Sequence, residues 1–143
     1  MPFVRVWVHY VWAAKNREPI LTHELRSALF SHIEENAKAK GLYLDRVNGH
    51  LEHVHCLVSL GTSQTIDKVV QLLKGESSFW FNNKSDLKAP KLEWQDEYFA
   101  VSISESGIDA VRAYIDNQEA HHKKKTFAQE YDELMTKYGF KIG

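Results

Sequence analysis

The stretch His53-Val54-His55-Cys56-Leu57-Val58-Ser59-Leu60 alternates between two sets of side chains. Successive side chains of a strand point to opposite faces, so this spacing predicts a strand from His50 to Leu60. One set is wholly apolar and consists of Val54, Cys56, Val58 and Leu60. The other set consists of Leu51, His53, His55 and Leu57. We expect the apolar set to pack in the core and the two imidazoles to project together from the opposite face.

The segments on either side predict further strands and helices. Residues 3–12 form an alternating strand, with Val4, Val6, Val8, Tyr10 and Trp12 on one face and Arg5, Trp7 and His9 on the other. Thr22 caps a helix that Gly41 closes, and Thr65 caps a second helix that runs past Gly75. Asn48-Gly49 predicts a hairpin turn between a strand over 42–48 and the histidine strand.

The remaining elements complete the predicted topology. A fourth strand is expected at about 98–104, and a helical region from about 108 to 138 breaks near Lys125-Thr126. The order strand, helix, strand, strand, helix, strand predicts an α+β fold, a ferredoxin-like (split βαβ) antiparallel sheet. We expect helices on one face of this sheet, a further C-terminal helix, and an open second face that carries the site. Residues 1–143 suit a single domain.

Composition limits the class of protein. The 143 residues carry a net charge of −1 and include one cysteine, Cys56, so no internal disulfide is possible and a cytoplasmic location is expected. No apolar run reaches the length that a membrane helix needs, so no membrane association is expected. The slightly acidic balance does not favour general nucleic-acid binding, but local basic patches can bind phosphates. The candidate patches are Lys15 with Arg17, Lys68 with Lys74, and Lys123-Lys124-Lys125.

Two groups of residues can carry chemistry. His53 and His55 share one face of a strand and offer half of a metal site, although two hydrogen-bonded structural histidines would give the same pattern. Tyr114 and Gln118 lie one helical turn apart and would project side by side. The alternative is that Tyr114 packs at the helix edge and Gln118 is exposed. His121 and His122 follow, as further ligands, DNA contacts or a solvated helix end.

Together these groups resemble the HUH nucleases, and more narrowly the single-tyrosine transposases of small bacterial insertion sequences and their REP-associated relatives. The metal-strand motif of that family resembles residues 50–58, and its catalytic helix resembles residues 111–122. The resemblance extends to residues 8–12 and 15–21 near the start of the chain. It also includes residues 73–78 of the second helix and the approach to the fourth strand at 94–99.

The resemblance implies a mechanism. His53, His55 and Gln118 would hold one divalent cation, Mg²⁺ or Mn²⁺, and Tyr114 would be the nucleophile that forms a 5′-phosphotyrosine. Single-stranded DNA, marked by a hairpin, would be the substrate. A homodimer is implied, with the catalytic helix acting on its own or on the partner's histidines. Candidate DNA contacts are Arg5, His9, Lys15 and Arg17, which could instead form a dimer interface.

Other functions fit parts of the same pattern. A ferredoxin-like sheet with exposed aromatic residues and basic loops also describes a non-catalytic nucleic-acid-binding module. That interpretation expects aromatic residues where His53 and His55 stand, and it gives Tyr114 and Gln118 no role. A small metal-dependent hydrolase would use the histidines without a covalent intermediate. A domesticated nuclease that processes chromosomal repeats would share the chemistry of a mobile element's transposase.

Overall fold

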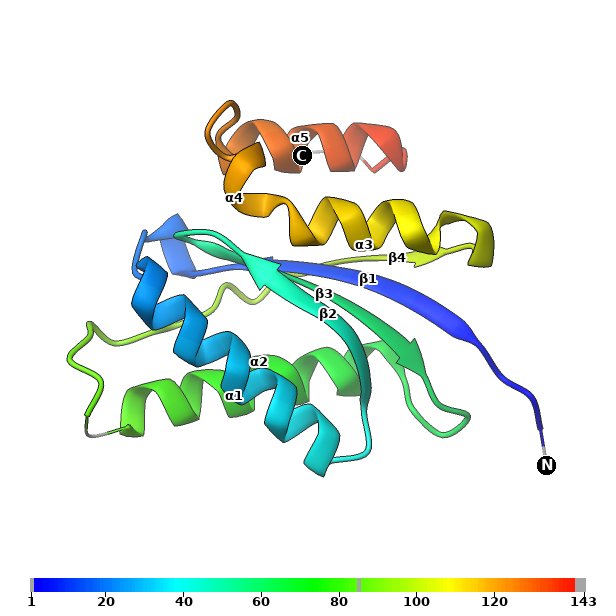
Figure 1. Ribbon diagram of the computed structural model, residues 1–143, viewed down its shortest axis with the longest axis horizontal. Coiled ribbons are helices and arrows are strands. Elements are labelled where there is room, and N and C mark those ends of the chain that lie inside the picture. Colours follow the sequence, from blue (N-terminus) through cyan, green and yellow to red (C-terminus); the bar gives the residue numbers. More distant parts are fainter. Residues whose placement is uncertain (1, 85, 141–143) are drawn as a thin grey trace.

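Four antiparallel strands form one sheet in the order β2-β3-β1-β4 (Figure 1). The structure is a computed structural model and describes residues 2–84 and 86–140. Each strand is antiparallel to its neighbours in the sheet, and β1 and β3 lie at the centre. The strands are β1 (Val6–Ala13), β2 (Tyr43–Gly49), β3 (His53–Leu60) and β4 (Phe99–Ile103).

Helices cover both faces of this sheet (Figure 1). On one face lie α1 (His23–Ala39) and α2 (Ile66–Asn83). On the other lie α3 (Ile108–Asp116), α4 (Gln118–His121) and α5 (Phe127–Lys137). The α+β, ferredoxin-like arrangement with additional C-terminal helices is confirmed. The second face is not open, because the C-terminal helices lie over it and enclose the histidines.

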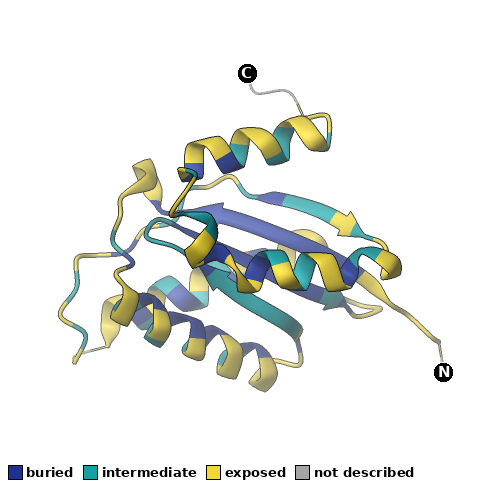
Figure 2. Ribbon diagram, turned by 45° about the horizontal axis from the view of Figure 1, so that its top comes forward, coloured by how far each residue is buried: buried dark blue, intermediate teal, exposed yellow. Residues whose placement is uncertain are grey.

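The main core lies between the sheet and the pair α1 and α2. Alternate side chains of the two central strands fill it, and the outer sides of these helices are exposed (Figure 2). Burying a large apolar side chain contributes about 1.5–3 kcal/mol, so this layer holds most of the stabilising contacts. Its strand residues include Val8, Tyr10, Trp12, Val54, Cys56 and Val58, all at most 2% exposed. The predicted apolar face of β3 is confirmed, and that of β1 is confirmed from Val8 to Trp12. Val4 and Val6, expected on the same face, are exposed, because they lie at and before the start of β1, beyond the cover of α1 and α2.

The second face has two smaller apolar clusters. Trp7 and Leu57 pack with Ile108 and Ile115, and this contact seats α3 on the sheet. The other cluster seats α5 and consists of Val11, Ala13, Phe99 and Phe127. A strip between these clusters is left for polar side chains, and His9, His53 and His55 lie there, each at most 3% exposed.

Thr22 stands at the N-cap position of α1, as expected, but its side chain makes no capping hydrogen bond. The other predicted helix ends follow the expected chemistry. The Thr65 side chain accepts a hydrogen bond from Lys68 N at 3.2 Å, and Gly41 closes α1 with a φ of +74° that favours glycine. The predicted break at Lys125-Thr126 is present, and Thr126 with Gln129 forms a capping box at the start of α5. A second break occurs at Asn117, whose φ of −99° and ψ of 19° end α3.

The predicted turn at Asn48-Gly49 is wrong. Both residues belong to β2, where Gly49 pairs with Val54, and the connection to β3 is formed by residues 50–52. Contacts with the segment that follows β1 fix this later turn, because Glu52 O accepts a hydrogen bond from Ala14 N and Leu51 O accepts one from Leu21 N, both at 2.8 Å. The side chain of Asn48 is therefore free to donate to Ile115 O at 2.8 Å, which ties α3 to β2.

Among the described residues, no helix has both the length and the apolar character that crossing a bilayer requires.

Candidate active site

The four residues singled out from the sequence converge on one buried point. His53 and His55 project from β3 and are fully buried. Gln118, also fully buried, places Oε1 2.9 Å from His53 Nε2. The ring of Tyr114 on α3 lies edge-on to the ring of His55, with centroids 5.5 Å apart. The two histidines of β3 and the pair Tyr114 and Gln118 thus meet within a single subunit, although 65 residues separate His53 from Gln118.

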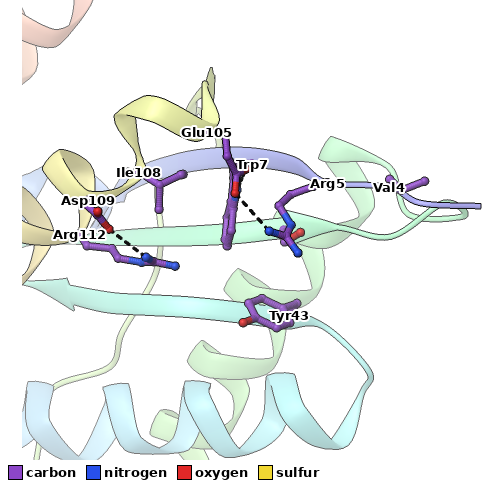
Figure 3. Close-up of a pocket in the computed structure, with 9 residues that line it drawn as sticks. Val4, Arg5, Trp7, Tyr43, Glu105, Ile108, Asp109 and Arg112 are labelled. Carbon is purple, nitrogen blue, oxygen red and sulfur yellow. Dashed lines mark hydrogen bonds and ion pairs between the residues drawn. The ribbon is translucent and has the colours of Figure 1, made fainter.

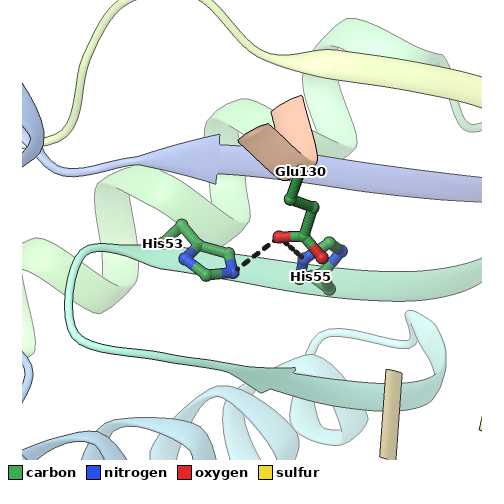
Figure 4. Close-up of side chains that lie close together, drawn as sticks. All are labelled: His53, His55 and Glu130. Carbon is green, nitrogen blue, oxygen red and sulfur yellow. Dashed lines mark hydrogen bonds and ion pairs between the residues drawn. The ribbon is translucent and has the colours of Figure 1, made fainter. Parts of the chain in front are cut away.

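A fifth residue, Glu130 on α5, stands at the centre of this group and was not anticipated from the sequence (Figure 4). Its carboxylate is 1% exposed, and Oε1 lies 3.2 Å from His53 Nε2 and 3.3 Å from His55 Nε2. The Gln118 amide donates to Oε2 at 3.0 Å, and the Tyr114 hydroxyl donates to the same oxygen. One carboxylate therefore contacts every residue of the predicted site.

Glu130 has a detectable signature once the helix is known. Phe127, Tyr131 and Leu134 mark the apolar face of α5, and Glu130 falls on that same face at helical spacing. A carboxylate on a buried helix face needs a partner, because burying an unpaired charge is costly. The sequence offered this signal, but nothing local connected it to His53.

The orientation of His53 is set by two neighbours. Its Nδ1 lies 2.7 Å from Oε1 of Glu52, the preceding residue, so the opposite nitrogen, Nε2, faces the site. The ring of Phe127 stacks on the imidazole, with centroids 4.1 Å apart and planes 13° apart. A carboxylate behind a histidine fixes ring orientation and tautomer in many metal sites. Glu52, to which the sequence assigned no role, is a positioning residue for His53.

His9 performs a similar task for His55. His9 Nε2 lies 2.9 Å from His55 Nδ1, and the two rings are stacked with centroids 5.2 Å apart. Burial lowers the pKa of His9 to about 3, so this imidazole is neutral near pH 7. The side chain of His9 is 3% exposed and lies behind the site. It is therefore not on an accessible surface where it could contact DNA.

The electrostatics of the group centre on Glu130. Burial alone would raise its pKa, but hydrogen bonds with His122, His53 and His55 hold the pKa far below its usual range, so the carboxylate is ionised. Burial lowers the pKa of His55 to about 4. His53 responds in the opposite way, because its hydrogen bonds to Glu130 and Glu52 outweigh burial and raise its pKa. Burial, together with the charge of Glu130, raises the pKa of Tyr114.

His121 and His122 do not form a solvated helix end. His122 Nε2 lies 3.1 Å from both Gln118 Oε1 and Glu130 Oε1, and its ring stacks on His50 with centroids 5.1 Å apart. His121 Nε2 is 3.4 Å from Glu130 Oε2. That nitrogen is buried and, among the described residues, makes no hydrogen bond, so its contact with Glu130 is close but is not a hydrogen bond.

The donor set suits a divalent cation. His53, His55 and Glu130 each offer one ligand atom, and these atoms lie within 4.8 Å of one another. Two imidazole nitrogens, a carboxylate oxygen and the Gln118 amide oxygen match the nitrogen and oxygen ligands of first-row divalent metals. The unpartnered nitrogen of His121 adds to this fit, since a buried polar atom without a hydrogen bond is rare. A His-His-Glu group that can bind a divalent metal is thus present.

The position of Tyr114 depends on how α3 is held against β2. The Arg112 guanidinium donates to both oxygens of the Asp45 carboxylate, at 2.8 and 3.0 Å, in a bidentate pair. Asp45 is largely buried, with 8% of its side chain exposed, so this pair is better shielded than a typical surface ion pair. Arg46 adds a contact to Asp116 at the end of the same helix.

Three of the candidate DNA contacts lie on the surface. Lys15 and Arg17 are exposed in a short 3-10 turn between β1 and α1. The Arg17 guanidinium lies over the ring of Phe127, 5.1 Å from its centroid, so this basic turn borders α5 and the site. Arg5 is farther away and pairs with Glu105 at 3.1 Å.

Arg5 lines a separate cavity of about 500 Å³ (Figure 3). This cavity lies between the start of β1 and the start of α3, and Trp7, Tyr43, Glu105 and Arg112 point towards it. Trp7 Nε1 donates to Glu105 at 2.8 Å, which fixes one wall. None of its lining residues belongs to the histidine group, so the size of the cavity does not mark the chemical site.

Comparisons with known proteins identify the fold and the family of the chain. A protein of Deinococcus radiodurans R1 assigned as a transposase has a similar crystal structure, with a TM-score of 0.65 and 24% identity over 82% of this chain and 93% of that one. A REP-associated tyrosine transposase bound to a REP hairpin has a TM-score of 0.61 and 16% identity, covering 85% of this chain and 72% of that one. These likenesses establish the fold. No curated protein matches. The sequence pattern of the IS200-like transposases matches residues 3–118, so the chain belongs to that family.

Proposed function

We propose that this transposase nicks and rejoins single-stranded DNA through a covalent 5′-phosphotyrosine on Tyr114, with His53, His55 and Gln118 holding a divalent cation. Residues 1–143 would act as one domain. The observation that carries the proposal is the meeting of four side chains from β3, α3 and α4 at one buried point. A non-catalytic binding module needs no such convergence of a phenol, an amide and paired imidazoles.

Tyr114 supplies the nucleophile. Its oxygen attacks the scissile phosphorus, and the bond from phosphorus to the 3′-oxygen breaks. The phenol loses its proton, and the departing 3′-oxygen takes up one proton. The product is a 5′-phosphotyrosine with a free 3′-OH. In rejoining, a 3′-OH attacks the phosphotyrosine and its proton returns to Tyr114, so no external energy source is needed.

The cost of ionising Tyr114 defines what the surrounding residues must do. A phenol of ordinary pKa is only about 0.1% ionised at pH 7, equivalent to about 4 kcal/mol, and burial beside Glu130 raises that cost. A bound Mg²⁺ or Mn²⁺ supplies positive charge that stabilises the phosphate and the phenolate oxygen. His53, His55 and Gln118 orient the ligand atoms, and Glu52 and His9 hold the two imidazoles in place.

The substrate proposal rests on the surface near the site. Lys15 and Arg17 lie on an exposed turn whose basic side chains suit phosphate contacts, and Arg5 is a more distant candidate. The similar tyrosine transposase was solved with a REP hairpin, which supports a hairpin-marked strand as the substrate here. We further propose that the protein forms a homodimer and acts in the cytoplasm. A domesticated copy acting on chromosomal repeats would use the same chemistry.

The test is cleavage of a labelled single strand that carries a hairpin, with Tyr114→Phe compared with the wild type. The variant retains the aromatic ring but has no nucleophilic oxygen, so we expect cleavage to fall by about three orders of magnitude or more while hairpin binding changes little. Tyr43→Phe is a matched control, because Tyr43 is 61% exposed and lies outside the site. A covalent protein–DNA adduct should form with the wild type and with Tyr43→Phe.

The outcomes separate the alternatives. Cleavage by Tyr114→Phe at the wild-type rate would remove Tyr114 from its role. Cleavage without any adduct would favour a hydrolase. Hairpin binding without cleavage by the wild type, in the presence of Mn²⁺, would favour a binding module.

A further inference from the structure

We propose that Glu130 completes the cation site as its anionic ligand, so that docking of the C-terminal helix α5 is coupled to divalent-cation binding. This inference rests on the proposed function, since it assigns one more ligand to the same site. It adds a third ligand-bearing element to β3 and α4, and it gives α5 a chemical role.

The first argument is the absence of a fixed positive partner for Glu130. Within residues 2–84 and 86–140, the close nitrogen neighbours of its carboxylate from basic side chains belong to four histidines, and no lysine or arginine pairs with it. A buried carboxylate is expected to be paired or to coordinate a metal, because burial of an isolated charge costs far more than folding can offset. Clustered imidazoles are themselves metal ligands, so the partner that best satisfies all of them is a cation.

The second argument is the spacing of the ligand atoms. A six-coordinate cation with ligands at about 2.1 Å has neighbouring ligand atoms about 2.9 Å apart. The Nε2 of His53 lies 2.9 Å from Gln118 Oε1 and 3.2 Å from Glu130 Oε1, and the Nε2 of His55 lies 3.3 Å from the same carboxylate oxygen. These separations are within about 0.4 Å of the spacing that an octahedral cation requires.

The third argument is that α5 is built to deliver this carboxylate. The capping box of Thr126 and Gln129 fixes the start of the helix one turn before Glu130. Phe127 packs on His53, and Tyr131 lies beside Phe127 with ring centroids 5.6 Å apart. The apolar face of α5 therefore brings Glu130 to a fixed position against β3 and does not leave it on a mobile tail.

The fourth argument separates this ligand from the part of the chain that defines the family. The match to the IS200-like transposases covers residues 3–118 and ends at Gln118. Glu130 lies 12 residues beyond Gln118, on a helix outside the matched segment. The proposed anionic ligand thus lies outside the residues of this chain that match the family.

The experiment measures Mn²⁺ binding directly, from the loss of the electron paramagnetic resonance signal of free Mn²⁺. We expect Glu130→Gln to weaken binding at least about tenfold, as expected for loss of a residue that sets metal affinity. Glu133→Gln is the matched control, because Glu133 lies on α5 with a 56% exposed side chain and pairs with Lys125. It should bind Mn²⁺ as the wild type does. His53→Ala should abolish binding.

A second measurement needs only the wild type and guards against misfolding of the Glu130 variant. Hydrogen exchange of residues 127–137 should slow on addition of Mn²⁺, whereas α1, on the other side of the sheet, should not change. Wild-type binding that His53→Ala abolishes, with Glu130→Gln unaffected and no change in α5, would overturn the role of Glu130 and leave the proposed function standing. If the wild type binds no Mn²⁺, both proposals fail.

Discussion

The ring of Phe127 lies nearly parallel to the imidazole of His53, with their centroids 4.1 Å apart. Phe127 begins α5, and His53 begins β3, so this contact joins the C-terminal helix to the strand that carries the histidine pair. Stacking restricts rotation of the imidazole, and the same phenylalanine packs with Val11, Ala13 and Phe99 in the core. One side chain therefore contributes both to stability and to the direction of a ligand atom.

Phe127→Leu should separate these two contributions. The substitution retains most of the apolar volume, so we expect a loss of about 1 kcal/mol in unfolding free energy, measured by urea denaturation. Affinity for Mn²⁺ should fall severalfold because His53 loses its stacking surface. Phe79→Leu is the control, since Phe79 is 66% exposed and its replacement should change stability by less than about 0.5 kcal/mol. Unchanged Mn²⁺ affinity in Phe127→Leu would show that stacking does not orient His53.

Glu52→Gln should weaken Mn²⁺ binding by about tenfold to a hundredfold. The Glu52 carboxylate holds His53 Nδ1 at 2.7 Å, and loss of such an outer partner typically lowers metal affinity by this factor. Isothermal titration with Mn²⁺ gives the measurement. Glu35→Gln, at an exposed position of α1 on the other side of the sheet, should leave the affinity unchanged. Equal affinities for the two variants would contradict the positioning role of Glu52.

Gly49→Ala should be strongly destabilising. A Cβ atom at this position would lie 2.1 Å from the backbone oxygen of His53, so β2 and β3 must separate where the metal strand begins. We expect a loss of about 3 kcal/mol or more in unfolding free energy, measured by thermal and chemical denaturation. Gly75→Ala provides the opposite sign, because Gly75 lies within α2 and a Cβ there meets nothing within 4 Å. The unfolding free energy of that variant should rise by about 0.5–1 kcal/mol. Equal destabilisation of the Gly49→Ala and Gly75→Ala variants would refute the steric explanation.

Lys15→Ala should weaken hairpin binding and make it less sensitive to salt. If Lys15 contacts one phosphate of a single strand, the slope of log affinity against log salt should fall by about 0.7. Fluorescence anisotropy at several salt concentrations measures both quantities. Lys38→Ala, exposed on α1, is the control and should retain the wild-type slope. A slope unchanged by Lys15→Ala would place the DNA path elsewhere.

The sequence predicted those parts of the fold that local patterns encode. Alternation in 3–12 correctly divided Val8 from Trp7, and alternation in 50–60 correctly divided Val58 from Leu57, because a strand has a period of two. The turn at Asn48-Gly49 failed for a physical reason. Its position is set by hydrogen bonds from Ala14 and Leu21, and these are distant in the sequence.

In the candidate site, too, local sequence patterns predicted some contacts, whereas contacts between residues distant in the sequence were missed. Periodicity alone placed His53 beside His55, and Gln118 was expected near Tyr114 from helical spacing. Glu130 was missed because 75 residues and a break in the helix separate it from His55. No local spacing reports a contact of that kind. The burial of His9 was also missed, because the sequence did not show that α3 and α5 would cover the second face.

The break at Asn117 separates Tyr114 from Gln118, the two site residues of the predicted catalytic helix. Tyr114 belongs to α3 and Gln118 to α4, so the proposed nucleophile and the amide are carried by two helical segments joined at one residue. If the proposed strand transfer occurs, a change in the Asn117 backbone torsions would move Tyr114, with any DNA end attached to it, relative to Gln118. An uninterrupted helix would move both together, and each exchange of DNA ends would then dismantle the pocket in which the next joining reaction must occur.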